Sequence, residues 1–112
     1  MERVNLSNST SLSRIVYGMW RLADDVNVSS QHIGEKINIC LDQGITSFDQ
    51  AAVYGLYTSE SLFGEALKAN PSFREKIEII SKCGIVNPSA SYSNASVSHY
   101  DTSKEHNFNS VD

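Results

Sequence analysis

Three short apolar runs alternate with two amphipathic segments, and this order constrains the fold of the chain more than any other feature. The apolar runs are residues 13–20, 45–48 and 77–81, and each has the length of a strand. The run 45–48 is apolar along nearly its whole length, as expected of a strand that is covered on both faces. An order of strand, helix, strand, helix, strand favours parallel βαβ units. The sequence therefore predicts an α/β fold.

The first helix is predicted to begin at Ser29 or Ser30 and to end before Gly44. A serine hydroxyl accepts a free backbone N–H at a helix start, so either serine is a suitable N-cap. Gly44 lies where the left-handed residue that ends a helix is expected. The apolar residues between them recur at the spacing of one helical face; they are Ile33, Ile37, Cys40 and Leu41.

The second helix is predicted to begin at Thr58 or Ser59, which are again suitable N-caps. It is expected to end at Asn70, because a residue that precedes proline avoids the helical conformation. The apolar stripe of this helix consists of Leu62, Phe63, Ala66 and Leu67.

The remaining segments carry weaker signals. From its residues alone, the polar segment 1–13 is predicted to be a loop, as is the segment 21–28. Residues 87–100 are rich in serine and show no periodicity, which is typical of a long functional or disordered loop. Thr102 and Glu105 have the spacing of a capping box. They predict a last helix that begins near Ser103 and runs to Asp112.

Three chemically active side chains follow the predicted strands. Asp49 and Tyr54 come after the second strand, and Lys82 ends the third. Side chains at the carboxyl ends of parallel strands meet on one face. A free tyrosine has a pKa of about 10, and a nearby ammonium favours its ionised form. A carboxylate would hold that ammonium in place, so the three form a candidate catalytic group. The structural alternatives are a half-buried aromatic at Tyr54, a strand-end cap at Asp49 and a solvated charge at Lys82.

Four short motifs follow one another along the chain. They are Gly18-Met19-Trp20, Asp49-Gln50-Ala51-Ala52-Val53-Tyr54-Gly55, Glu60-Ser61-Leu62-Phe63-Gly64-Glu65-Ala66-Leu67 and Lys82. Together they resemble the aldo-keto reductase family, which carries Asp-x-Ala-x-x-Tyr-Gly, then Glu-x-x-x-Gly-x-Ala-Leu, then a lysine at the end of the next strand. The likeness runs from about Arg14 to Gly84.

The resemblance implies that the fold is the N-terminal three βα units of a (β/α)8 TIM barrel, truncated. A complete barrel needs roughly 250 residues, so residues 1–112 are expected to be an incomplete N-terminal portion of the reductase domain. The family also implies a small hairpin in the segment 1–13 and a catalytic histidine beyond Asp112. The chain is thus expected to be a piece of a longer reductase or the product of a truncated gene.

The resemblance further implies an oxidoreductase that transfers hydride between NADP(H) and the carbonyl of an aldehyde or ketone. Tyr54 would be the general acid, and Asp49 would pair with Lys82 and orient it. Gly18, Met19 and Trp20, with Asp49, would lie beside the cofactor and the substrate; the structural alternative for the first three is core packing at a tight turn. Residues 1–112 alone are expected to be inactive. The alternative function is that of a non-catalytic truncated product or an interaction fragment of the barrel.

Composition excludes several other classes of protein. The net charge is −4 and the chain has no basic tract, which argues against nucleic-acid binding. No stretch approaches the roughly 20 apolar residues of a membrane span. No apolar region follows Met1, so a signal peptide is not expected and the cytoplasm is the predicted location. No pair of histidines or cysteines has the spacing of zinc ligands, and no metal is expected.

The cysteines and histidines give no further site. Cys40 and Cys83 are expected to be reduced, with Cys40 in the core; a reactive thiol at Cys83 is the alternative, because this residue follows Lys82. The histidines considered as substitutes for the missing catalytic one are His32, His99 and His106. None of them ends a predicted strand, so all three are set aside.

Overall fold

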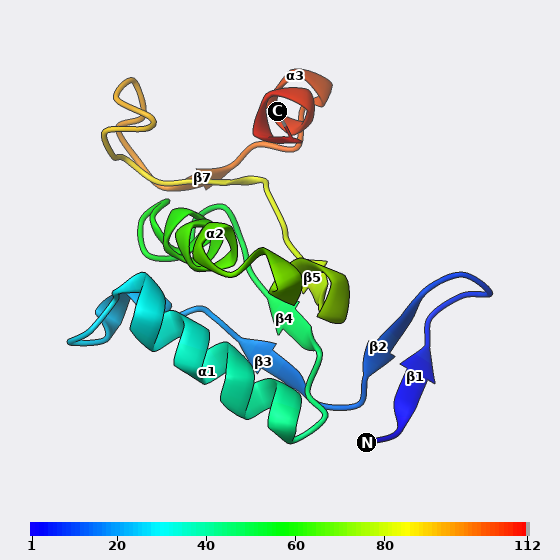
Figure 1. Ribbon diagram of the computed structural model, residues 1–112. Coiled ribbons are helices and arrows are strands. Elements are labelled where there is room, and N and C mark those ends of the chain that lie inside the picture. Colours follow the sequence, from blue (N-terminus) through cyan, green and yellow to red (C-terminus); the bar gives the residue numbers. More distant parts are fainter. Residues whose placement is uncertain (112) are drawn as a thin grey trace.

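The computed structural model describes residues 1–111 (Figure 1). Asp112, at which the last helix was predicted to end, lies outside the described residues. The elements are β1 (Arg3–Asn5), β2 (Ser11–Ser13), β3 (Val16–Gly18), η1 (Leu22–Asp24), α1 (Ser30–Asp42), β4 (Ser47–Asp49), α2 (Ser59–Ala69), η2 (Pro71–Lys76), β5 (Glu78–Ile80), β6 (Ile85–Val86), β7 (His99–Tyr100) and α3 (Lys104–Val111).

The centre of the fold is a parallel sheet in the order β3-β4-β5, with α1 and α2 packed against it (Figure 1). Both strand pairings are parallel, and Gly18, Asp49 and Ile80 share one register position at the carboxyl edge. The predicted α/β fold built from βαβ units is therefore confirmed. The first strand is shorter than the predicted 13–20, because Ser13 belongs to β2, where it pairs with Arg3.

The core forms where the two helices meet the sheet. The ring of Phe48 on β4 lies 5.8 Å from that of Tyr17 and 5.7 Å from that of Phe63, measured between centroids. Such aromatic pairs contribute about 0.5–1.5 kcal/mol beyond their buried area. Five of the predicted inner residues are buried here, namely Ile33, Ile37, Cys40, Phe63 and Ala66, whereas Leu41, Leu62 and Leu67 are partly buried and pack against them. The buried cluster consists of Met19, Leu22, Ile33, Ile37, Cys40, Phe48, Phe63, Ala66, Phe73 and Ile77.

The ends of α1 agree with the sequence, and α2 ends before Asn70 as predicted, but the predicted side-chain cap at the start of α2 is absent. The Ser29 hydroxyl accepts the His32 N–H at 3.2 Å, as an N-cap should, and Gly44 has a φ of +77°. Thr58 precedes α2, but its hydroxyl donates to the Gly55 carbonyl at 2.6 Å and does not cap the helix. Ser59 does not cap it either, because this residue is fully buried and its hydroxyl faces the core.

Two segments expected to be loops contain paired strands. The prediction of a loop at 1–13 from residues alone is wrong, since β1 and β2 form an antiparallel hairpin, as the family resemblance implied. The long loop predicted at 87–100 is wrong at its end, where His99–Tyr100 pairs with Ile85–Val86. The capping box is also corrected: the Ser103 hydroxyl, not that of Thr102, accepts the His106 N–H at the start of α3.

A polar network fastens the N-terminal hairpin to the sheet. The Arg3 guanidinium lies 2.5 Å from a carboxylate oxygen of Glu78 and donates to the Thr46 hydroxyl at 2.9 Å. The same Glu78 oxygen accepts hydrogen bonds of 3.0 Å from the hydroxyls of Thr46 and Ser47. Burial raises the pKa of Glu78, but these hydrogen bonds and the charge of Arg3 outweigh it, so the net pKa is lowered.

No helix in the range 1–111 is long and apolar enough to cross a membrane.

Candidate active site

The structure brings Asp49, Tyr54 and Lys82 together at the carboxyl edge of the sheet. Asp49 ends β4, Tyr54 lies in the turn that follows, and Lys82 comes two residues after β5. The Lys82 ammonium donates to the Asp49 carboxylate at 2.6 Å. It also lies 5.2 Å from the centroid of the Tyr54 ring, within the range of a cation–π contact. One ammonium therefore contacts both of the other side chains.

Lys82 is held in its charged form by these neighbours. Desolvation lowers the pKa of Lys82, but the hydrogen bond to Asp49, the interaction with Tyr54 and the charge of the Asp49 carboxylate outweigh it, and the net pKa is raised. The side chain remains 48% exposed, so the ammonium also reaches solvent. The arrangement places a permanent positive charge beside a phenol.

Gln50 is a part of this site that the sequence analysis did not identify. Its backbone carbonyl oxygen accepts a second hydrogen bond from the Lys82 ammonium, at 2.9 Å. Its side chain is 1% exposed and is fixed among the Met19 sulfur at 3.0 Å, the Ser59 hydroxyl at 3.0 Å and the Ser59 carbonyl at 3.4 Å. A glutamine between Asp49 and an apolar segment was the available signal, because a buried amide requires partners.

The turn after Tyr54 has an unusual backbone. Gly55, Leu56 and Tyr57 have φ angles of 62°, 51° and 69°, so three successive residues adopt the left-handed conformation. This conformation costs roughly 1–2 kcal/mol for each residue that has a Cβ. It is stabilised by hydrogen bonds to the Tyr54 carbonyl from the Thr58 N–H at 3.3 Å and the Ser59 N–H at 3.1 Å. The strain adjoins the candidate acid, where strained residues tend to gather.

The three residues predicted to face the cofactor lie at the end of β3, but they are not equally accessible. Gly18 is opposite Asp49 in the register, and a Cβ added to it would meet no atom within 4 Å. Trp20 is 69% exposed, with the Arg21 guanidinium 5.9 Å from its ring centroid. Met19 is 1% exposed and packs in the core, while its N–H donates to the Asp49 carbonyl at 3.0 Å.

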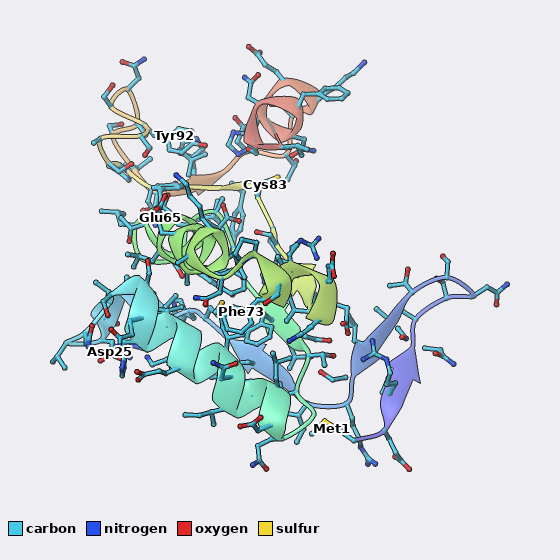
Figure 2. All side chains as sticks on the ribbon, viewed as in Figure 1. Met1, Asp25, Glu65, Phe73, Cys83 and Tyr92 are labelled. Atoms are coloured by element: carbon cyan, nitrogen blue, oxygen red, sulfur yellow. The ribbon has the colours of Figure 1, made fainter. Side chains whose placement is uncertain are left out.

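The loop after Trp20 is tied to α1 by Asp25, which is labelled in Figure 2. The Asp25 carboxylate pairs with the Lys36 ammonium and lies 3.4 Å from the His32 ring. The hydrogen bond from Lys36, followed by that from the Asn27 N–H, lowers the pKa of Asp25 to about 2. His32 thus contacts this loop from the first turn of α1.

A cavity of about 260 Å³ adjoins Tyr54 and Lys82. Apart from these two residues its lining is mainly apolar or small, and it consists of Ala51, Val53, Cys83, Gly84, Ile85, Tyr100 and Thr102. Cys83 lies on the segment that leads from β5 towards β6 (Figure 2), is exposed, and has its sulfur 3.5 Å from the Asn107 side chain. The site is therefore open to a small molecule.

The other two histidines lie on later elements of the chain. His99 lies in β7 and His106 is buried in α3, where its ring is 3.9 Å from the Asp101 carboxylate. Within residues 1–111, no group of three or more histidine, cysteine, aspartate and glutamate side chains is placed to hold a metal ion.

Comparisons with known proteins agree on one family. The profile of the aldo/keto reductase family matches residues 14–112. A 6-dehydroglucose reductase of Agrobacterium fabrum is 55% identical over 106 residues, which are 95% of this chain and 36% of that protein. The uncharacterized oxidoreductase YcsN of Bacillus subtilis is 44% identical over 112 residues, 100% of this chain and 37% of that protein. The chain thus spans about a third of the length of these curated relatives.

Solved structures show the same fold. PA4992 of Pseudomonas aeruginosa superposes with a TM-score of 0.76 at 24% identity, covering 97% of this chain and 39% of that one. The holo form of the aldo-keto reductase AKR11C1 of Bacillus halodurans gives 0.73 at 22% identity, covering 99% and 34%. The predicted α/β fold, made of βα units from the first part of a barrel, is confirmed. Because the family profile covers most of the sequence, the chain belongs to the aldo/keto reductase family.

Proposed function

We propose that the protein carrying this chain transfers hydride between NADP(H) and the carbonyl carbon of an aldehyde or ketone. The observation that supports this most is the Lys82 ammonium, which contacts the Asp49 carboxylate and the Tyr54 ring at the carboxyl edge of the sheet. Membership of an oxidoreductase family and relatives that are called reductase and oxidoreductase support the same reaction class. Residues 1–112 would be the N-terminal portion of the catalytic domain, and the cytoplasm its location.

In this proposal Tyr54 donates the phenolic proton to the carbonyl oxygen of the substrate. Lys82 stabilises the negative charge that develops on the phenol oxygen, because an ammonium beside a phenol favours its ionised form. Asp49 and the Gln50 carbonyl hold the ammonium at 2.6 and 2.9 Å, so it does not reorganise during the reaction. When bound, the nicotinamide supplies or accepts the hydride.

The end of β3 fits a planar ring of this kind. Gly18 leaves open space where a side chain would stand, and the exposed indole of Trp20 offers an apolar surface nearby. Both residues and Asp49 share the carboxyl edge of the sheet. We therefore assign Gly18, Trp20 and Asp49 to the cofactor and substrate side of the site. Met19 would contribute through its buried side chain, which packs beneath that edge.

A chimeric reductase tests this function. It consists of residues 1–112 followed by the part of the Agrobacterium fabrum reductase that lies beyond its matched segment. We expect NADPH oxidation with nitrobenzaldehyde. The change Lys82→Met should lower kcat by about 10² or more, and Asp49→Asn by about tenfold, since the lysine remains.

Cofactor affinity, measured separately by fluorescence quenching, should stay nearly constant in the lysine variant. Equal losses of affinity and turnover in both variants would instead assign the cluster a structural role. A folded chimeric reductase, verified by circular dichroism, that reduces no carbonyl would favour a non-catalytic function for this segment.

A further inference from the structure

Tyr57 joins the turn that follows Tyr54 to the chain segment that follows Lys82. Its hydroxyl donates to the Ile85 carbonyl at 3.2 Å and accepts the Asn87 N–H at 2.7 Å. Ile85 begins β6, and Asn87 directly follows it. The Tyr57 side chain thus connects the turn that follows Tyr54, the candidate acid, with the segment that follows Lys82.

The segment held by Tyr57 forms a wall of the cavity beside Tyr54. Ile85 and Tyr100, which face each other in the β6–β7 ladder, both line that cavity. Their aliphatic and aromatic surfaces make this wall apolar. A molecule whose polar end contacts Tyr54 and Lys82 would therefore place an apolar body against the β6–β7 hairpin.

This hairpin needs an anchor outside itself. Each of its strands has two residues, and an isolated two-stranded hairpin is marginally stable in water. The Tyr57 ring also packs on that of Tyr92, with 5.0 Å between centroids, and Tyr92 belongs to the connection between β6 and β7. Tyr57 therefore supplies both a ring contact and two hydrogen bonds from outside the hairpin.

The backbone of Tyr57 indicates that these bonds are maintained against strain. Its φ of 69° lies in the left-handed region, which a bulky residue with a Cβ rarely adopts. The preceding Leu56 is left-handed as well. Such a conformation persists where surrounding contacts determine it, and the hydroxyl bonds to Ile85 and Asn87 are contacts of this kind.

We propose that Tyr57 is a positioning residue that fastens the β6–β7 hairpin beside Tyr54 and thereby sets the affinity for carbonyl substrates with an apolar body. This proposal rests on the proposed reductase function for its substrate class. That Tyr57 holds the hairpin in place is a separate claim, and it can be tested without measuring enzyme turnover.

The test compares Tyr57→Phe with Tyr92→Phe in the chimeric reductase. The first removes the hydroxyl that bonds Ile85 and Asn87; the second removes a hydroxyl from the neighbouring ring and leaves those two bonds intact. For Tyr57→Phe we expect the KM for nitrobenzaldehyde to rise by about tenfold, with kcat changed by less than about threefold. The KM for propanal, whose short chain offers little apolar surface to the hairpin, should change by less than about twofold.

Amide hydrogen exchange provides the readout that does not depend on activity. The Asn87 N–H should exchange faster in Tyr57→Phe than in Tyr92→Phe, because it loses its acceptor. Equal exchange in the two variants would overturn the proposal, whether or not the chimeric reductase turns over. Faster exchange with equal KM changes for both aldehydes would overturn the link to substrate affinity. Absence of turnover in the parent chimeric reductase would refute the reductase function instead. The hydrogen-exchange comparison would still show whether Tyr57 holds the hairpin in place.

Discussion

The change Gly55→Ala should destabilise the protein because two separate costs fall on one methyl group. The φ of Gly55 is +62°, a left-handed conformation that costs a residue with a Cβ roughly 1–2 kcal/mol. The added Cβ would also lie 2.7 Å from the Ala23 Cβ and 2.7 Å from the Thr58 hydroxyl oxygen. Overpacking of this kind costs typically about 1–3 kcal/mol, so the expected loss of unfolding free energy is roughly 2–5 kcal/mol.

Gly64→Ala is the matched control, since it makes the same chemical change nine residues further along the chain. Gly64 lies inside α2, is exposed, and has no atom within 4 Å of an added Cβ. Alanine is favoured over glycine in a helix by roughly 0.5–1 kcal/mol. This variant should therefore be slightly more stable than the parent, whereas Gly55→Ala should be less stable.

Thermal unfolding of the chimeric reductase, followed by circular dichroism, measures both changes. For a domain of this size 1 kcal/mol corresponds to about 2–4 °C. We expect a midpoint that is about 4–20 °C lower for Gly55→Ala and about 1–4 °C higher for Gly64→Ala. Equal midpoints in the two variants would refute the reasoning, because they would show that neither the left-handed turn nor the contact with Ala23 constrains residue 55.

Three further predictions concern stability and reactivity. The folded-state pKa of Glu78 is lowered, so its ionised carboxylate stabilises the folded protein. This contribution to the free energy of unfolding should be complete above the usual pKa of about 4.3 and should be lost as the pH falls further. Arg3→Ala should therefore weaken the loss of stability of the chimeric reductase as the pH falls below about 4.3, measured by urea titrations; an unchanged profile would contradict the network at the hairpin. In the folded protein the exposed Cys83 thiol should react with a maleimide. Cys40 is buried, which raises its pKa, so it should react only when the protein unfolds. Equal reaction rates of the two thiols would argue against the packing of α1. Residues 1–112 alone should aggregate and reduce no aldehyde, because β3 and β5 are unpaired edges of the described sheet; a monomer with a sharp melting transition, or measurable turnover, would be evidence against this.

The order of elements in the central sheet was predictable because hydrophobic spacing encodes it. Ile33, Ile37 and Cys40 lie on the buried face of α1, as their spacing indicated. The β6–β7 hairpin was not predictable, since each strand has two residues and lies beside a serine-rich segment with no alternation. The side-chain caps of α2 and α3 were misassigned because neighbouring hydroxyl residues have similar propensities. The Thr58 hydroxyl bonds the Gly55 carbonyl instead of a helix N–H, and Ser103 rather than Thr102 caps α3.

In the candidate site, too, some features could be predicted from the sequence and others could not. The meeting of Asp49 and Lys82 could be expected from their places at the ends of adjacent parallel strands. Tyr57 could not be identified in this way, because its partners Ile85 and Asn87 are remote in the sequence and bond through backbone atoms. Met19 lies within a motif predicted to face the cofactor, yet its side chain is buried, because local sequence does not specify on which side of a strand end a residue packs.

The central claim is that Tyr54 supplies the proton, and the kinetics of Tyr54→Phe in the chimeric reductase test it most directly. The control is Tyr100→Phe, which removes a hydroxyl from another tyrosine of the same cavity. We expect kcat for nitrobenzaldehyde to fall by about 10²–10⁴ in Tyr54→Phe, with the NADPH dissociation constant nearly unchanged, and by less than about threefold in Tyr100→Phe. Parental turnover in Tyr54→Phe would contradict the account.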